Sequence, residues 1–466
     1  MLLKNKIDEL KNLVENSDNI LISKEECYCY AEDASNFPDN TTIPEAVIFV
    51  TTEPEVQRII KYANENEIPV ITRGAGTNMV GACVCNKGGI VLNFSKMNRI
   101  LEIDDVSMTA RVQAGVVLGN LKSEAEKVGL YFPPDPSNYK VSTVGGAIAQ
   151  SSGGAMSFKY GTTKDYVLSL RVVTANGDLV TFGAETTKDS VGYHLAQLMV
   201  GSEGTLGVVT EAVLRLIPKP QTANVIVTYF NNIKDAVNAV DKITSNGISP
   251  SAVEFMDKNA VSTVEEYAHC KFKTIYDCVI LLEIDGDERS VMSQIERALP
   301  ILEQSGAAKV YVPPSKDDYE RVWNARRSSY AASSRIAPDV ISDDIIVPRK
   351  NLAEMVEKCN EISKKYNLNI CLVGHIGDGN LHPQFVLNAS NEVEFQNYMN
   401  AKAEMYSTAI SLGGTISAEH GVGIEKMGYL RSVVDNRAIE YMKAVKRVFD
   451  PNNILNPNKI FRLDKE

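Results

Sequence analysis

Three of the five histidines lie close together in the sequence, and their surroundings indicate metal chemistry. His375 ends the apolar run ICLVG, and His382 follows it after the turn residues GDGN. A tight turn between paired strands can bring both imidazoles to one point. Two imidazoles and one carboxylate are a usual ligand set for Zn²⁺, Mn²⁺ or Fe²⁺. The spacing therefore predicts a metal site, and a pair of turn histidines that only form hydrogen bonds is the alternative.

Glu419 and His420 are adjacent in the sequence, and they offer a carboxylate for the predicted metal site and a further imidazole. On an extended chain neighbouring side chains point to opposite sides, so one could bind a metal while the other addresses a substrate. The other two histidines, His194 and His269, are expected to have ordinary surface or packing roles.

The glycines gather in RGAGTNMVGA (73–82), TVGGAIAQSSGG (143–154) and GSEGTLGVVTE (201–211). Such clusters are costly in entropy unless the backbone must approach a ligand, and backbone N–H groups in such loops bind phosphate. Tight turns in a large sheet are the alternative. The spacing of Gly74, Gly76 and Gly81 does not fit the nicotinamide-dinucleotide fingerprint, so we expect a dinucleotide outside a Rossmann domain.

Periodicity predicts the elements that position these residues. Thr52 and Glu55 form a possible capping box before a helix whose apolar residues repeat from Val56 to Ala63. A short buried strand, 68–72, then leads into the first glycine stretch. The pair Asn176–Gly177 predicts a hairpin with a type I′ turn.

The composition changes at LRLIPKPQ (214–221), where we place a domain boundary. Beyond it, helices at about 234–246, 287–304, 351–366 and 392–412 alternate with strands, which is typical of an α+β domain built on an antiparallel sheet. A basic amphipathic helix is expected at about 434–449.

Length and composition limit the possible classes. With 466 residues, 44% of them hydrophobic, the chain can form two or three domains of roughly 150 residues. A net charge of −11 without a basic cluster argues against nucleic-acid binding. The N-terminus has no signal-peptide pattern, and no apolar run reaches the ~20 residues of a membrane span. Eight cysteines without a C-x-x-C pair favour reduced thiols in a cytoplasm.

Several of these motifs, in order over about 30–460, resemble one flavoprotein superfamily. RGAGTN, FPPDPSN, TVGGAIAQSSGG, KYGTTKDYV and GSEGTLGVVTE resemble the FAD-binding domain of the vanillyl-alcohol-oxidase/p-cresol-methylhydroxylase (PCMH) superfamily. GHIGDGNLH and SAEHGVGIEK resemble its glycolate-oxidase-subunit, D-lactate and D-2-hydroxyglutarate dehydrogenase branch.

The resemblance implies an α+β fold in three parts. These are a PCMH-type FAD-binding domain at 1–218, a ferredoxin-like antiparallel-sheet cap domain for the substrate at 219–415, and a C-terminal helical segment at 416–466. The last segment would carry the Glu–His motif back to the FAD domain.

The resemblance also implies FAD as the cofactor. The residues expected to bind it are Arg73, Gly74, Ala75, Gly76, Thr77, Asn78, Pro134, Asp135, Ser137, Thr143, Gly146, Ser152, Gly153, Tyr160, Gly161, Thr162, Glu203, Gly204, Gly207 and Val209. Of these, Glu203, Gly204, Gly207 and Val209 are expected at the adenine-ribose end. Relatives with covalent flavin carry a histidine in the first glycine loop; this chain has none there, so noncovalent FAD is expected.

By the same resemblance, His375, His382 and Glu419 would hold a divalent metal (Fe, Zn or Mn), and His420 would be the catalytic base. In VWNARRSS, Arg326 is expected to bind the substrate carboxylate; Arg327 and a helix-surface ion pair are the alternatives. Glutarate-type relatives use a cation on the strand before V-P, where this chain has Asp343 and Asp344. That departure favours small monocarboxylates.

These expectations combine into an FAD-dependent D-2-hydroxy-acid dehydrogenase, acting on D-lactate to give pyruvate. An electron-transfer flavoprotein or another soluble protein would accept the electrons. Glycolate or D-2-hydroxyglutarate, with a quinone or another acceptor, are alternatives. A metal-dependent hydrolase and a noncatalytic flavoprotein subunit are more remote ones.

Overall fold

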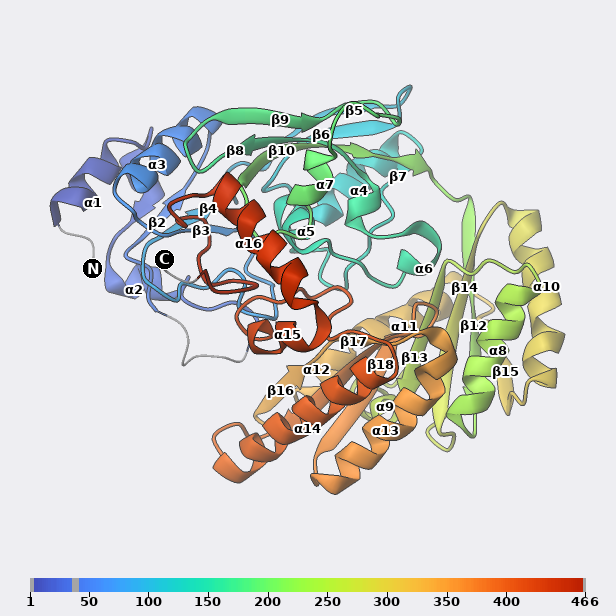
Figure 1. The fold of residues 1–466 in the computed structure, drawn as a ribbon. Helices are drawn as coiled ribbons and strands as arrows, with labels where there is room; N and C mark the ends of the chain where they lie inside the picture. The colour runs from blue at the N-terminus through green and yellow to red at the C-terminus, as the bar shows by residue number, and fades with distance from the viewer. Residues whose placement is uncertain (1–3, 36–41, 464–466) are drawn as a thin grey trace. The chain divides into compact units, whose positions relative to one another are not determined.

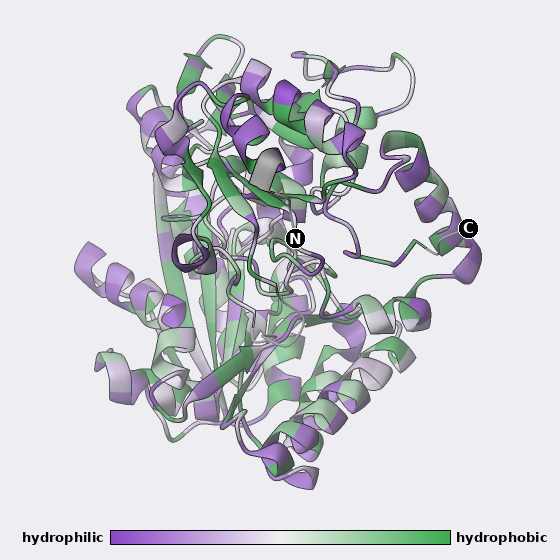
Figure 2. Cartoon of the chain, turned by 90° about the vertical axis from the view of Figure 1, so that its left-hand side faces the viewer, coloured by the Kyte–Doolittle hydropathy of each residue, from purple (hydrophilic) through white to green (hydrophobic). Residues whose placement is uncertain are grey.

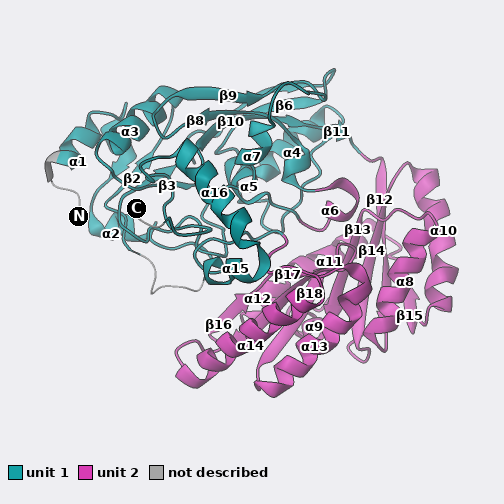
Figure 3. Cartoon of the chain, viewed as in Figure 1, with its two compact units in different colours: residues 1–153, 162–219, 419–466 teal, residues 154–161, 220–418 magenta. Residues whose placement is uncertain are grey.

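The computed structural model describes residues 4–35 and 42–463, which form two compact units (Figure 3). Unit 1 contains the described residues of 1–153, 162–219 and 419–466, and unit 2 contains 154–161 and 220–418. The chain enters unit 2 first for residues 154–161, and then again between Lys219 and Pro220, from which it returns between Ala418 and Glu419.

A four-stranded sheet forms the N-terminal core of unit 1 (Figure 1). Its order is β1-β2-β4-β3, with β2, β4 and β3 parallel and β1 antiparallel to β2. The bounds are β1 Ile20–Leu21, β2 Ala46–Phe49, β3 Val70–Arg73 and β4 Ile90–Asn93. Helices α1 (Lys4–Lys11) and α3 (Glu53–Glu65) contribute Leu10, Ile59 and Ile60 to its core.

Helix α3 confirms the predicted helix, but the predicted capping box is wrong. Thr52 is the N-cap residue, yet its hydroxyl donates to Glu15 and caps no helical N–H. The buried carboxylate of Glu55 instead accepts hydrogen bonds from the backbone N–H groups of Glu15 and Thr51. These contacts with residues outside the helix replace the local box.

A five-stranded antiparallel sheet completes unit 1, in the order β5-β6-β10-β8-β9. Its bounds are β5 Ile100–Asp104, β6 Thr109–Gln113, β8 Val167–Val173, β9 Leu179–Gly183 and β10 Val208–Arg215. The remaining elements of the unit are α2 Lys24–Tyr28, α4 Leu118–Lys127, β7 Leu130–Tyr131, α5 Val144–Gln150, α7 Leu195–Met199, β11 Ile217–Pro218, α15 Leu430–Val433 and α16 Asn436–Phe449.

The hairpin β8–β9 forms as predicted, with a different turn. Gly177 has φ +85°, but Asn176 is not among the described residues with positive φ, so the turn is not type I′. The N–H of Gly177 donates to the Thr174 carbonyl, and the N–H of Thr174 donates to the Asp178 carbonyl. Only the glycine takes the left-handed conformation, as in a type I turn followed by a glycine bulge.

Unit 2 is built on one antiparallel sheet, with order β15-β12-β14-β13-β18-β19-β16 and β17 paired with β19. The strands are β12 Thr222–Phe230, β13 Ala252–Asp257, β14 Cys278–Gly286, β15 Lys309–Tyr311, β16 Asp339–Ser342, β17 Ile345–Ile346, β18 Asn369–His375 and β19 Asn380–Leu387. The helices are α6 Ser157–Tyr160, α8 Ile233–Ser245, α9 Lys258–Ala268, α10 Glu288–Gln304, α11 Lys316–Arg327, α12 Ser329–Ser333, α13 Leu352–Lys365 and α14 Glu392–Ser411. The predicted α+β class is confirmed.

Helices cover both faces of this sheet: α8, α10, α13 and α14 form one layer, and α9, α11 and α12 the other. In Figure 2 the strands are mainly hydrophobic, whereas the helices show both hydrophobic and hydrophilic residues. No described helix is both long enough and apolar enough to cross a membrane.

The sheet face under α9, α11 and α12 changes from apolar to polar along its strands. Met256, Leu281 and Val373 belong to its apolar core, and side chains two residues away on each strand, in either direction, lie on the same face. Those side chains are Glu254, Glu283 and His375. The fold thus places charged groups at one end of an otherwise apolar sheet face.

Candidate active site

A cavity in unit 1 is lined by residues from all three glycine-rich stretches, together with Glu419 and His420. Most of the residues predicted to bind FAD line it. They are Arg73, Gly74, Ala75, Gly76, Thr77, Asn78, Ser137, Thr143, Gly146, Ser152, Gly153, Glu203, Gly204, Gly207 and Val209.

The other five predicted FAD residues are not among those that line this cavity: Pro134, Asp135, Tyr160, Gly161 and Thr162. Asp135 forms an ion pair with Lys122 at 3.2 Å. Tyr160 and Gly161 belong to unit 2, where the Tyr160 hydroxyl donates to Asp285. The backbone N–H of Thr162 donates to Asp165.

Two glycines show why the cavity wall needs residues without side chains. Gly76 has φ +72°, and a Cβ there would lie 2.1 Å from Nη2 of Arg73. Gly204 has φ +70°, and a Cβ there would lie 2.6 Å from Oγ1 of Thr72. A wall of backbone and small side chains lets an extended dinucleotide approach closely, so these residues fit FAD.

Glu203 has a role that sequence reasoning missed. Its buried carboxylate accepts hydrogen bonds from the backbone N–H groups of Val422 at 2.7 Å and Gly423 at 2.8 Å. Burial raises the pKa of Glu203 to about 7, although these hydrogen bonds oppose the shift. Glu203 therefore fixes the segment that follows Glu419 and His420, and we find no local sequence signal for this long-range contact.

Glu419 and His420 do not diverge as they would on an extended strand. His420 Nε2 lies 4.0 Å from Glu419 Oε1, and both side chains face the cavity of unit 1. The chain bends at these residues, so the alternation expected of a strand does not apply.

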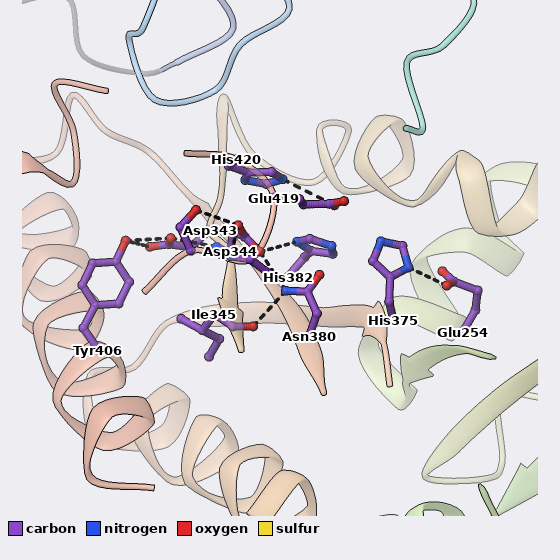
Figure 4. Close-up of polar contacts among 12 residues, drawn as sticks. Glu254, Asp343, Asp344, Ile345, His375, Asn380, His382, Tyr406, Glu419 and His420 are labelled. Carbon is purple, nitrogen blue, oxygen red and sulfur yellow. Dashed lines mark hydrogen bonds and ion pairs between the residues drawn. The ribbon is translucent and has the colours of Figure 1, made fainter. Parts of the chain in front are cut away.

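In unit 2, His375 and His382 lie at facing ends of β18 and β19. Their ring centroids are 5.1 Å apart, as the predicted turn requires (Figure 4). Gly379 in the turn has φ +85°, and a Cβ there would lie 2.1 Å from the Val347 carbonyl oxygen. The tight turn thus depends on glycine and brings the two imidazoles together.

Glu254, on β13, contacts two of the predicted site residues. Its Oε1 lies 2.5 Å from His375 Nδ1, and its Oε2 lies 2.7 Å from Arg326 Nη2. Burial favours a raised pKa for Glu254, but the charges of His375 and Arg326 outweigh burial and hold its pKa below the usual value. The signal in the sequence was a lone carboxylate inside the apolar run SAVEFMD, which was not predicted as a strand.

Asp344 lies beside His382, at a distance longer than a hydrogen bond. His382 Nδ1 lies 3.7 Å from Asp344 Oδ1, which also accepts a hydrogen bond from Asn380. The other oxygen of Asp344 accepts from the Ser417 hydroxyl and the Ala418 N–H, directly before Glu419 in the chain. Asp344 therefore joins the His382 strand to the end of unit 2.

The remaining predicted groups are placed as follows. Asp343 is buried and accepts hydrogen bonds from the Tyr406 hydroxyl. Arg327 lies over the Trp323 ring at 5.3 Å, while Arg326 faces Glu254. His194 and His269 lie at exposed helix ends.

The donor set of unit 2 fits a divalent transition metal. Each imidazole has its Nδ1 beside a buried carboxylate, which leaves Nε2 as the nitrogen suited to coordination. The hydrogen-bonded pair of His375 and Glu254 is typical of metal-binding histidines, and the His382–Asp344 contact is longer.

Comparisons with known proteins agree with the fold and the cavity. Residues 44–183 match the "FAD binding domain" family, and residues 219–460 match "FAD linked oxidases, C-terminal domain". The chain is 42% identical to glycolate oxidase subunit GlcD of Bacillus subtilis, covering 93% of this chain and 92% of that protein. It is 36% identical to D-lactate dehydrogenase of Anaerostipes hadrus, covering 90% and 89%.

A solved structure of p-cresol methylhydroxylase matches with a TM-score of 0.84 at 16% identity, covering 100% of this chain and 99% of that chain. This likeness confirms the predicted PCMH-type fold. Together with the family matches over both parts of the chain and the extent of the relatives' similarity, it shows that the chain belongs to the FAD-linked oxidases, in their D-2-hydroxy-acid dehydrogenase branch.

Proposed function

We propose that the protein oxidises D-lactate to pyruvate with noncovalent FAD. The main support is that a chain with an FAD-binding family match also carries Arg326 and His375 on one buried carboxylate, Glu254, with the His382 imidazole beside them. These groups suit the carboxylate and hydroxyl of a 2-hydroxy acid. Glycolate and D-2-hydroxyglutarate are the alternative substrates.

Each side chain has a distinct part in the proposed reaction. Arg326 binds the substrate carboxylate through its guanidinium and orients the α-carbon. His375, His382 and Glu419 would hold a divalent Fe, Zn or Mn ion, and the ion would supply Lewis acidity at the substrate hydroxyl. His420 accepts the hydroxyl proton as general base. FAD supplies the acceptor for the hydride of the α-carbon.

The preference for a small monocarboxylate is supported by Asp343 and Asp344. Both carboxylates are buried, and their hydrogen bonds go to Tyr406, Asn380, Ser417 and Ala418. Two buried acids between β16 and β17 oppose a second substrate carboxylate there.

The substrate is tested by anaerobic stopped-flow reduction of the yellow holoenzyme. D-lactate should bleach the flavin. The rate constant for flavin reduction divided by the substrate Kd should be larger for D-lactate than for glycolate or D-2-hydroxyglutarate. A larger ratio with D-2-hydroxyglutarate would contradict the monocarboxylate assignment.

For the electron acceptor we propose an electron-transfer flavoprotein, working with this enzyme in the cytoplasm. The chain has no C-x-x-C pair for an iron–sulfur cluster, and its eight cysteines are free thiols, which fits a reducing compartment. D-lactate and catalytic enzyme should reduce an added electron-transfer flavoprotein under anaerobic conditions. Reduction of a soluble quinone alone would contradict this partner.

A further inference from the structure

Glu254 is a fully enclosed charged side chain next to the proposed site residues. It lies on β13, between β14 and β18, and is 1% exposed. Each of its carboxylate oxygens contacts a different partner: Oε1 the Nδ1 of His375, and Oε2 the Nη2 of Arg326. These partners come from β18 and α11, so a single carboxylate joins two separate elements.

A neighbouring buried acid shows what a purely structural carboxylate looks like in this sheet. Glu283, on β14, is also 1% exposed and lies on the same sheet face. Its carboxylate accepts hydrogen bonds from the Ser251 and Tyr319 hydroxyls. Neither partner belongs to the proposed active site, whereas both partners of Glu254 do.

We propose that Glu254 is a positioning residue that holds the metal ligand His375 and the carboxylate-binding Arg326 in a fixed relation. This inference rests on the proposed function for the roles of its two partners. By bonding Nδ1 of His375, Glu254 directs Nε2 towards the metal. By bonding one terminal nitrogen of Arg326, it sets the plane of the guanidinium.

The Arg326 side chain supports a role beyond the ion pair. Its Nε is buried and has no hydrogen-bond partner among the residues that the structure describes. A buried donor without a partner is costly, so it suits a group that a bound ligand completes. A substrate carboxylate would supply that acceptor. By holding both Arg326 and His375, Glu254 sets the separation between the group for the substrate carboxylate and the proposed metal ligand, as a 2-hydroxy acid requires.

The proposal is tested with Glu254→Gln, Glu254→Asp and the matched control Glu283→Gln, all as FAD-loaded full-length protein. Zn²⁺ affinity is measured by equilibrium dialysis of metal-depleted protein, and Kd for D-lactate by anaerobic flavin reduction. Loss of a carboxylate behind a metal-binding histidine typically weakens metal affinity about 10–100-fold. Glu254→Gln should show that loss and also raise the Kd for D-lactate, because an amide has one acceptor oxygen where the carboxylate has two and so cannot keep both contacts.

The two other variants separate positioning from stability. Glu283→Gln should keep Zn²⁺ affinity and the Kd for D-lactate within about twofold of the wild type. Glu254→Asp keeps the charge but is one methylene shorter, so it should keep only part of the contacts with His375 and Arg326. Its Zn²⁺ affinity and its Kd for D-lactate should lie between those of the wild type and of Glu254→Gln. If Glu254→Gln does not fold with FAD, Glu254→Asp decides: it should bind both Zn²⁺ and D-lactate more weakly than the wild type and Glu283→Gln do.

Two results would overturn the proposal: wild-type Zn²⁺ and D-lactate binding in the Glu254 variants, or equal losses in the Glu283 control. The Zn²⁺ measurement does not depend on turnover. If the wild-type flavin is not reduced by any 2-hydroxy acid, the proposed function fails, while Zn²⁺ affinity still tests the link from Glu254 to His375.

Discussion

At the scale of single residues, His420 is the proposed proton acceptor, and it lines the cavity of unit 1 beside Glu419. His420→Ala should slow flavin reduction by D-lactate about 10²–10⁴-fold, the usual contribution of a positioned general base. FAD content and metal content should stay near normal, because neither is assigned to this side chain. Stopped-flow kinetics and elemental analysis measure these quantities.

The exposed His194, at the start of α7, provides the control for this variant. His194→Ala should reduce its flavin at the wild-type rate. A His420→Ala enzyme that is as fast as the wild type, or that has lost its metal, would contradict the role of His420 as base.

Gly76 tests the placement of FAD in the cavity. A valine there would bring its Cβ to within 2.1 Å of Arg73 Nη2 unless Arg73 moves, so Gly76→Val should lower FAD occupancy. Gly192→Val is a matched control, because Gly192 has φ +76° but nothing lies within 4 Å of the position that a Cβ would take there. Flavin absorbance per protein measures occupancy; equal occupancy in the two variants would show that the loop does not bind FAD.

At the scale of elements, Glu203 ties the glycine-rich segment before β10 to the chain after His420. Because burial raises its pKa from 4.5 to about 7, the folded chain binds more protons than the unfolded chain between these values. The contribution of this group to stability is therefore present below about pH 4.5 and is lost as the pH rises through about 7.

Glu203→Gln removes this titration. Between pH 5 and 8 the Tm of the wild type should fall more than the Tm of the variant. The Tm of the variant minus that of the wild type should therefore increase as the pH rises. The exposed Glu392→Gln should follow the wild type at every pH. A difference between Glu203→Gln and wild type that does not change with pH would refute the raised pKa.

Local patterns predicted the elements with clear periodicity, and missed one strand that builds the site. The regular apolar spacing of α3, α10 and α13 indicated helices that the structure contains. Strand β13 is buried along its whole length, so its residues show no alternation of polar and apolar side chains. The partners of Glu254 follow from its pairing with β18 and from the position of α11, which no local pattern encodes.

At the scale of the whole molecule, the proposed reaction needs both FAD and the divalent metal assigned to His375, His382 and Glu419. Dialysis against a strong chelator should abolish D-lactate oxidation and leave FAD bound, and a divalent ion should restore activity. Undiminished turnover with no metal detected would exclude the proposed metal.

Substitution of one ligand locates the metal within the chain. His382→Ala should lose metal in elemental analysis, because an imidazole next to Asp344 is replaced by a methyl group. The exposed His269→Ala should keep it. Full metal content in His382→Ala would remove His382 from the ligand set.

Hydride transfer from a D-2-hydroxy acid to FAD is the step on which all the proposed residue roles depend. In the proposed function, Arg326 binds the carboxylate and His420 accepts the hydroxyl proton. Two fixed substituents of the α-carbon would let only one enantiomer direct its hydrogen towards the flavin. The most direct test is anaerobic mixing of the yellow holoenzyme with D-lactate or L-lactate, followed by flavin absorbance and pyruvate analysis. The account predicts that D-lactate bleaches the flavin and yields one pyruvate per FAD, while L-lactate leaves it oxidised. Bleaching by L-lactate alone, or D-lactate bleaching without pyruvate, would contradict it.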